Sequence, residues 1–404
     1  MPVASAPNAG SIEGEHYLSK ALAYAATSKT SPLGPITISR RELRSNDVNI
    51  EILYCGVCHT DIHTAHGEWD GLVYPNGTIY PCIPGHEIVG RVTSVGPNAK
   101  RIKVGEVVAV GTMVDSCLEC DYCKAGLEPY CEKHATWTYN APDRVTGENT
   151  QGGYSDSIVV REEFVLKLNF PEQSLAAVAP LLCAGITMWS PLRHWKIGAG
   201  SKVGIVGIGG LGHMGVKLAR ALGAHVVAFT TSEGKREDAL KLGAQEVVVS
   251  RKSEEMNAQA GKLDFILNTA AVPHNLDAYL ALLRHGGTMA LVGIPEKPHP
   301  SPSVASLIGL RRSLAGSLVG GIKETQEMLD FMSTTKRYLT SFFTIPGEGC
   351  LDLLHRNRLG FGNDATFGAE VAKAEYLARS GVDLCPVPHL KRKLQPNTQL
   401  ERIK

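Results

Sequence analysis

The chain has 404 residues, 43% hydrophobic and 20% charged, which is enough for roughly two or three domains with buried cores and unlike a disordered chain. Its 41 Lys and Arg balance 40 Asp and Glu, and a net charge of +1 argues against nucleic acid or an anionic membrane as a partner. No apolar run reaches the roughly 18 residues of a spanning helix, and no signal or transit peptide is evident. We therefore expect a soluble, cytoplasmic protein that binds neither nucleic acid nor a membrane.

The first part of the chain is rich in predicted strands. After a small, polar lead-in at residues 1–17, runs of Val and Ile alternate with Gly and Pro turns over about 18–165, as in 49–54 and 88–92. Helical patterns are scarce there. This spacing predicts a mainly β domain with long loops.

Metal-binding residue types occur in these loops and just beyond them. Cys58 follows a predicted strand, His86 and Glu87 follow a Pro-Gly pair, and Cys183 precedes the second half of the chain. Two thiolates and one imidazole on a metal would leave a fourth position open, as in catalytic zinc sites. Spacing does not establish such a site, because Cys58 and Cys183 are 125 residues apart. Buried cysteines and a hydrogen-bonded histidine are the alternative interpretation.

Four further cysteines lie close together in the sequence. They follow the pattern C-x2-C-x2-C-x7-C and are Cys117, Cys120, Cys123 and Cys131. Four thiolates can surround one Zn²⁺ tetrahedrally, and a site without an open position is structural. Two disulfides or four unrelated thiols are the alternative, and an iron–sulfur cluster would use the same ligands. The pattern indicates a metal, and we expect zinc.

The sequence changes character at about residue 173. Strand-like runs now alternate with helical stretches: 202–206 precedes 214–222, and 225–229 precedes 235–242. This alternation predicts a parallel sheet with helices on both faces. The pattern fades after about residue 332.

A glycine-rich turn follows the first of these strands. It matches G-x-G-x-x-G, and its members are Gly207, Gly209, Gly210, Leu211 and Gly212 around Ile208. A strand before the motif and a helix after it are the context in which such glycines let a pyrophosphate approach the backbone at a helix N-terminus. The context favours a dinucleotide-binding loop over a simple turn.

The end of the second strand indicates which dinucleotide binds. An acidic residue there would bind the ribose 2′-hydroxyl and repel a 2′-phosphate. The sequence instead has the hydroxyls of Thr231 and Ser232, followed by the cations of Lys235 and Arg236, which suit a phosphate. Glu233 is the exception, and it lies beyond the hydroxyls. We expect NADP rather than NAD.

These motifs together resemble the medium-chain zinc-containing alcohol dehydrogenases, in particular the cinnamyl-alcohol-dehydrogenase-like branch. The resemblance spans about residues 18–332, and its matching segments are 56–63, 84–90, 117–131, 150–154, 180–187 and 207–215. It implies an α/β plus β fold in which a GroES-like catalytic domain is interrupted by a Rossmann domain with a doubly wound parallel sheet. The implied boundaries are 1–177 for the catalytic domain with a structural zinc lobe at about 115–133, 178–320 for the Rossmann NADP-binding domain, and 321–404 for an atypical return to the catalytic domain.

The resemblance also implies roles around a catalytic zinc. Cys58, His86 and Cys183 would bind it, so that the chain would carry two zinc ions. Glu87 would lie behind the metal. Asp61 would orient His86 and fix its tautomer.

Further roles follow from the same resemblance. Thr60 and His63 would relay the proton, Thr187 would contact the nicotinamide, and His59 would lie near the pyrophosphate. Trp137 would shape the substrate pocket or, alternatively, pack beside the cysteine lobe, the segment 117–131 that carries the four clustered cysteines.

The implied activity is a zinc-dependent interconversion of primary alcohols and aldehydes, aromatic or medium aliphatic, by hydride transfer with NADP(H), in a homodimer. Residues 333–404 depart from the family, which leaves open an inactive or destabilised relative that keeps the fold. The loop 70–83 is also a few residues longer than usual. A zinc-independent quinone reductase is a further alternative, disfavoured by the presence of Cys58, His86 and Cys183. The neutral charge argues against a zinc-finger-type binding module.

Overall fold

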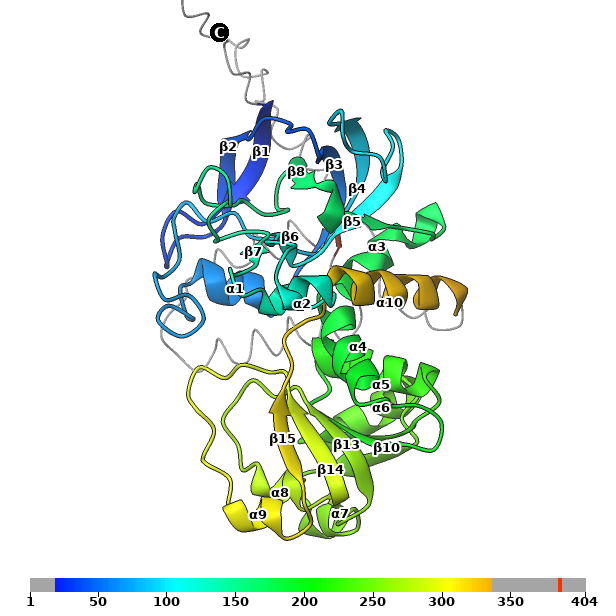
Figure 1. The fold of residues 1–404 in the computed structure, drawn as a ribbon. Coiled ribbons are helices and arrows are strands. Elements are labelled where there is room, and N and C mark those ends of the chain that lie inside the picture. The colour runs from blue at the N-terminus through cyan, green and yellow to red at the C-terminus, as the bar shows by residue number, and fades with distance from the viewer. Residues whose placement is uncertain (1–18, 336–383, 387–404) are drawn as a thin grey trace, which may run out of the picture.

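The computed structural model describes residues 19–335 and 384–386. Figure 1 shows a β-rich half formed by the first part of the chain and an α/β half formed by the part that follows, with helix α10 returning to the boundary between them. The predicted lead-in at 1–17 lies outside the described residues, and so does most of the predicted return at 321–404.

The β-rich half is built on one antiparallel sheet with the order β16-β3-β4-β5-β9, in which β8 also pairs with β3. Val48, Ile50 and Ile52 of β3 are at most 1% exposed and alternate with less buried residues, because successive side chains of a strand point to opposite faces. The strands are β3 (Asp47–Gly56), β4 (Ile88–Val95), β5 (Val107–Val110), β8 (Ser157–Arg161), β9 (Leu166–Lys167) and β16 (Leu384–Pro386).

Smaller elements surround this sheet. Two additional two-stranded sheets pair β1 (Ser19–Ala25) with β2 (Gly34–Arg40) and β6 (Met113–Asp115) with β7 (Thr136–Trp137). The helices are short: α1 (His59–Ala65), α2 (Asp121–Lys124), α3 (Leu175–Val178), and the 3₁₀ turns η1 (Glu128–Tyr130), η2 (Glu162–Phe164), η3 (Glu172–Ser174) and η4 (Ala179–Leu182).

Strand β16 lies within residues 333–404, the segment that departs from the family sequence. Its backbone pairs antiparallel with residues 54–56 of β3 and so adds a strand to the sheet of the β-rich half. The predicted domain boundaries themselves stay predictions.

The α/β half is a six-stranded parallel sheet with the order β12-β11-β10-β13-β14-β15. Alternate residues of β11 enter different apolar clusters: Val226 and Ala228 join one, and Val227 and Phe229 join the other. The sheet is therefore buried on both faces, as parallel sheets are. Its strands are β10 (Lys202–Val206), β11 (His225–Thr230), β12 (Glu246–Val249), β13 (Leu263–Asn268), β14 (Leu283–Leu291) and β15 (Ser313–Gly316).

Helices and turns connect these strands. They are α4 (Ala184–His194), α5 (Gly210–Ala221), η5 (Glu233–Lys235), α6 (Arg236–Lys241), α7 (Ser253–Asn257), α8 (Asp277–Leu280) and α9 (Val304–Ile308). Chain order reverses between β10 and β13, and this reversal is the switch point where doubly wound sheets bind ligands.

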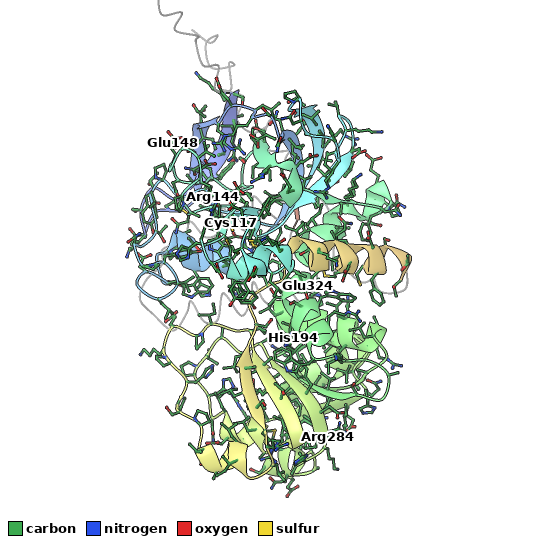
Figure 2. All side chains as sticks on the ribbon, viewed as in Figure 1. Cys117, Arg144, Glu148, His194, Arg284 and Glu324 are labelled. Atoms are coloured by element: carbon green, nitrogen blue, oxygen red, sulfur yellow. The ribbon has the colours of Figure 1, made fainter. Side chains whose placement is uncertain are left out.

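Helix α10 (Ile322–Thr334) joins the two halves. Its buried Met328, Leu329 and Met332 share an apolar cluster with α4. Figure 2 labels Glu324 where α10 meets α4, and its Oε2 accepts a hydrogen bond from the Ser190 hydroxyl at 2.9 Å.

No single helix within residues 19–335 is long and apolar enough to cross a membrane, and one bent pair, 172–182 with 184–194, meets both criteria only when taken together.

Candidate active site and metal centres

Four side chains from three distant segments of the chain meet between the two halves. Cys58 precedes α1, His86 and Glu87 precede β4, and Cys183 precedes α4. One ligand atom of each lies within 4.8 Å of all the others. The structure thus brings together the three predicted zinc ligands and the acidic residue expected behind them.

The geometry of this catalytic cluster (Cys58, His86, Glu87 and Cys183) fits a zinc ion. The two Sγ atoms are 3.8 Å apart, and two sulfurs bound tetrahedrally at about 2.3 Å would be separated by about the same distance. His86 Nε2 and Glu87 Oε2 are buried without a hydrogen-bond partner in the described part of the chain. Buried polar atoms are normally paired, so these two atoms mark a place where a ligand fits.

Asp61 holds the cluster from α1. Its Oδ1 accepts hydrogen bonds from His86 Nδ1 and from the Gly85 N–H, both at 2.9 Å. Its Oδ2 accepts from the Cys58 N–H and the Tyr154 hydroxyl, both at 3.0 Å. Because Nδ1 donates to a carboxylate, Nε2 is the ring atom that faces the cluster and would bind a metal.

The neighbours of each group explain its pKa. The hydrogen bond from Cys183 and the proximity of His86 lower the pKa of Cys58 well below its usual value, whereas that bond and burial raise the pKa of Cys183. Burial alone would lower the pKa of His86, but the charge of Asp61 raises it well above its usual value. Burial, and then the charge of Cys58, raise the pKa of Glu87. The cluster therefore carries protons that a metal would displace from its ligands.

Two glycines make room for this arrangement. A Cβ atom on Gly56 would lie 1.9 Å from Glu87 Oε2, so only glycine leaves space for that carboxylate. Gly85 has a φ of +102°, and a Cβ there would lie 2.7 Å from the Tyr154 N.

Helix α1 carries the predicted relay residues. The His63 ring stacks on Trp69 with centroids 4.7 Å apart, and its Nδ1 hydrogen bonds to Glu68 Oε2. Thr60 is half-buried at the start of the helix, and His59 is exposed. Sequence reasoning missed Glu68, because a glutamate five residues after a histidine carries no recognisable pattern.

The long loop after α1 packs against that helix. The Tyr74 hydroxyl lies 3.1 Å from Thr64 Oγ1, and the Tyr80 hydroxyl donates to the Ala65 carbonyl at 2.8 Å. Thr78 Oγ1 donates to the Thr64 carbonyl at 2.9 Å. The additional residues of the loop thus cover the C-terminal end of α1.

The glycine loop lies at the carboxyl end of β10. Gly207 has a φ of +87°, and a Cβ on Gly212 would lie 1.7 Å from the Gly207 carbonyl oxygen. Helix α5 begins at Gly210, with Gly209 as its N-cap. Gly207, Gly209, Gly210, Leu211 and Gly212 therefore form the tight strand-to-helix turn that the motif requires.

The predicted 2′-phosphate residues differ in their surroundings. Thr231 and Ser232 are exposed beyond β11, and Lys235 Nζ donates to the Ile208 carbonyl at 3.2 Å, which directs it toward the glycine loop. The Arg236 guanidinium instead bonds to the Val247 carbonyl at 2.6 Å and to Glu255 at 2.9 Å. Arg236 therefore already has protein partners.

Thr187 and Trp137 occupy different environments. Thr187 is buried in the first turn of α4, and its N–H donates to the Cys183 carbonyl at 2.9 Å. Trp137 lies beside the cysteine lobe and lines a hollow of about 410 Å³ that contains none of the catalytic cluster. The other lining residues are Tyr122, Leu127, Pro129, Tyr130, Cys131, His134 and Ala135.

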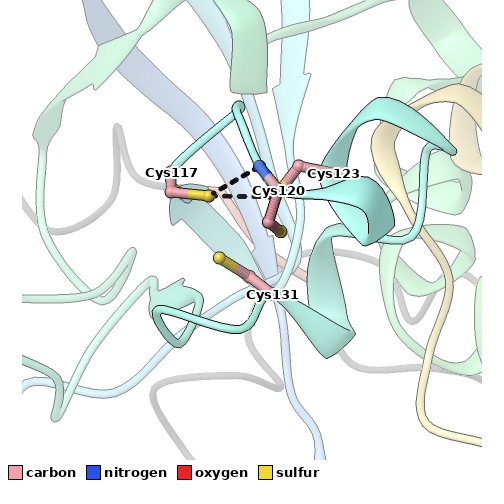
Figure 3. A group of neighbouring side chains, drawn as sticks. All are labelled: Cys117, Cys120, Cys123 and Cys131. Atoms are coloured by element: carbon pink, nitrogen blue, oxygen red, sulfur yellow. Dashed lines mark hydrogen bonds between the residues drawn. The ribbon is translucent and has the colours of Figure 1, made fainter.

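The four predicted structural ligands, Cys117, Cys120, Cys123 and Cys131, form a second compact group (Figure 3). Their sulfurs lie within 4.8 Å of one another, and those of Cys117 and Cys123 are 3.8 Å apart. The N–H groups of Cys120 and Glu119 lower the pKa of Cys117 to about 6. The eight cysteines within residues 19–335 are free, so no disulfide joins these four. The donor set suits one tetrahedral zinc.

Both halves of the chain match models of known protein families. A family model described as an alcohol dehydrogenase GroES-like domain matches residues 44–170, and one described as a zinc-binding dehydrogenase matches 210–334. The chain is 59% identical over 312 residues to the aldehyde reductase YahK of Escherichia coli, with 77% of this chain and 87% of that protein covered.

Solved structures are similar as well. A cinnamyl alcohol dehydrogenase from Sorghum bicolor matches with a TM-score of 0.74 and 40% identity, over 79% of this chain and 88% of that one. The CAD from Helicobacter pylori complexed with NADP(H) matches with a TM-score of 0.72 and 43% identity, over 79% and 89%.

Proposed function

Since this chain belongs to the medium-chain zinc-containing alcohol dehydrogenase family, we propose that Cys58, His86 and Cys183 hold its catalytic zinc. The protein is a zinc-dependent oxidoreductase that interconverts alcohols and aldehydes with NADP(H). The observation that carries the site assignment is the convergence of two sulfurs and the unpartnered His86 Nε2 in one buried cluster. The cysteine lobe (residues 117–131) holds the second, structural zinc.

Different residues of the site would have different roles in this reaction. When bound, zinc would supply a Lewis acid for the substrate oxygen, and NADPH would supply the hydride. Asp61 fixes His86 so that its Nε2 faces the other cluster atoms, and Glu87 adds a carboxylate within 4.8 Å of them. Thr60 and His63 pass the proton between the substrate and water, and the pairing with Glu68 orients the His63 ring for that step.

The coenzyme binds across the glycine loop at the switch point of the sheet. Thr187 contacts the nicotinamide, and His59 lies near the pyrophosphate. Thr231, Ser232 and Lys235 recognise the 2′-phosphate, and Arg236, which pairs with Glu255, is the second cation of the set. Lys235 is the strongest element of this set, because its ammonium already points toward the loop.

The double change Ser232→Ala and Lys235→Ala tests the coenzyme assignment. It removes one hydroxyl and one cation that only NADPH can use, so KM for NADPH should rise at least tenfold more than KM for NADH. Steady-state kinetics with both coenzymes measures the two constants. An equal rise for both coenzymes would contradict the assignment.

The substrates are primary aldehydes and alcohols, aromatic or medium aliphatic. A panel of such aldehydes, assayed with NADPH and NADH on metal-analysed protein, tests the function as a whole. We expect two zinc ions per chain and NADPH consumption. Zinc-loaded protein that turns over no aldehyde would indicate an inactive relative.

The assembly is a homodimer joined through the edge of the α/β sheet. Strand β15 is the last strand of that sheet, and the nearby apolar residues Ile308, Val304 and Leu310 are exposed. An edge strand beside exposed apolar side chains is a typical interface. The cytoplasmic location stays a prediction.

A further inference from the structure

The segment 317–322 carries the chain from the end of β15 to the start of α10, and two side chains of the cysteine lobe bind its backbone. The Tyr130 hydroxyl accepts a hydrogen bond from the Leu318 N–H at 3.0 Å. Glu128 Oε2 accepts one from the Ile322 N–H, in the first turn of α10, at 3.1 Å. Two lobe residues that follow Cys123 thus hold both ends of this segment.

Glycines bring the segment into direct contact with its neighbours. A Cβ on Gly321 would lie 1.8 Å from the Gly126 carbonyl oxygen and 2.3 Å from Glu128 Oε2. A Cβ on Gly320 would lie 2.7 Å from Ile186 of α4. The segment therefore lies against the cysteine lobe at one glycine and against α4 at the other, with no room for a side chain at either position.

The backbone between these contacts is strained. Val319 is a β-branched residue with a φ of +40°, in the left-handed region that such residues rarely adopt. A strained conformation of this kind persists only where surrounding contacts impose it. The hydrogen bonds on either side of Val319, to Tyr130 and Glu128, are contacts of this kind.

Glu128 is the stronger of the two contacts. Its residue is only 7% exposed, and a buried carboxylate that accepts an N–H at a helix N-terminus makes a charge-assisted bond with the favourable end of the helix dipole. Glu128 is itself fixed within the lobe, because its carbonyl accepts the Cys131 N–H at 3.0 Å, between two of the four cysteine ligands.

We propose that Glu128 is a positioning residue for coenzyme binding, through which the cysteine lobe holds segment 317–322 at the coenzyme edge of the sheet. Because all six strands are parallel, the carboxyl end of β15 lies on the same edge as the glycine loop, where doubly wound sheets bind their nucleotide. The inference rests on the proposed function, since it concerns binding of the same coenzyme.

The test compares three variants with the wild-type holoenzyme by fluorescence titration with NADPH, with zinc content measured in parallel. Glu128→Ala should raise the Kd for NADPH about tenfold with two zinc ions retained, the effect of losing one charge-assisted hydrogen bond. Glu128→Gln keeps an acceptor oxygen and should stay within about threefold of wild type. Glu119→Ala removes an exposed lobe carboxylate that pairs with Lys133, and it should leave the Kd unchanged.

Hydrogen exchange of the coenzyme-free protein gives a second measurement. Segment 317–322 should exchange faster in Glu128→Ala than in wild type. A folded, zinc-loaded Glu128→Ala protein with wild-type Kd and wild-type exchange would overturn the proposal. If Glu128→Ala does not fold, Tyr130→Phe decides: a raised Kd supports the proposal and an unchanged Kd overturns it. Wild-type protein that fails to bind NADPH would refute the proposed function instead, and the exchange comparison would still test the hold on the segment.

Discussion

Asp61 shows how one buried carboxylate can organise a metal site. It is 2% exposed and accepts four hydrogen bonds, from a ligand ring, from the backbone of a ligand residue, from Gly85 and from Tyr154. Burial would raise its pKa, but the charge of His86 and these donors lower it below the usual value. The carboxylate is therefore ionised, and all its neighbours are donors.

Asp61→Asn should disrupt this arrangement without changing its size. The amide group of Asn must face at least one donor, so His86 or the Cys58 backbone loses its acceptor. We expect zinc affinity and kcat/KM to fall by about 10–100-fold. Zinc retained after dialysis against a chelator measures the first effect. Asp70→Asn, which removes a carboxylate paired with Lys29 outside the cluster, is the control and should retain its zinc.

We propose that His63 exchanges protons with water. It is half-buried on α1, with its ring stacked on Trp69 and bonded to Glu68. His63→Ala should slow aldehyde reduction about 10–100-fold at low buffer concentration, and added imidazole or formate should partly restore the rate. Rates measured across buffer concentrations test this. A variant that is neither slowed nor rescued would remove His63 from the relay.

Elements with a local pattern could be predicted from the sequence. The glycine loop 207–212 and the cysteine lobe each lie within one short segment, so spacing alone indicated their chemistry. The alternation of strands and helices after residue 173 likewise predicted the parallel sheet. Short elements such as β7 and β9 carry no pattern, because two residues are too few to show a period.

Contacts between distant segments could not be predicted from spacing. Cys58 and Cys183 could be paired only through family resemblance, because nothing local connects residues 125 positions apart. The hydrogen bond from the Ile322 N–H to Glu128 could not be predicted for the same reason, because the two residues are far apart in the sequence. Tyr154 lies in a segment that matched the family, yet its bond to Asp61 depends on how its loop packs against α1.

The loop 141–149, on which Figure 2 labels Arg144 and Glu148, is fastened by an ion pair. Asp143 bonds to Arg44 at 2.9 Å and to the N–H groups of Val145 and Thr146. Partial burial would raise its pKa, but the Thr146 N–H and the Arg44 guanidinium lower it to about 2. A carboxyl group whose folded pKa lies below its unfolded value of about 3.9 stabilises the protein above pH 4 and loses that effect as pH falls toward 2.

Asp143→Asn should therefore destabilise the protein at pH 7 by about 1 kcal/mol, a value reduced for the solvent around the loop. The difference in Tm from wild type should shrink at pH 3. Thermal unfolding at both pH values measures it. Glu148→Gln changes an exposed carboxylate of the same loop and should leave Tm unchanged. A Tm difference that is equal at both pH values would contradict the role of the charge.

At the scale of the whole molecule, the catalytic cluster depends on both halves. Cys58, His86 and Glu87 come from the β-rich half, whereas Cys183 precedes α4, which packs against the parallel sheet. Helix α10 and segment 317–322 make further contacts between the halves. Glu324 of α10 accepts a hydrogen bond from Ser190 of α4, and the Ile322 N–H donates one to Glu128 of the cysteine lobe. Metal, coenzyme and substrate would therefore all bind where the halves meet, so their geometry depends on how the halves are held together.

The exposed apolar residues beside strand β15 are the surface through which we propose that the chain forms a dimer. Ile308 on α9 is 74% exposed beside the edge strand β15. Ile308→Glu would place a charge in the proposed interface, so we expect the dimer to dissociate into single chains, observed as a halved mass in light scattering. Val145→Glu changes an equally exposed apolar residue of the β-rich half, and this control should remain dimeric. A dimer that survives Ile308→Glu, or a wild-type protein that is already monomeric, would mean that β15 does not form the interface.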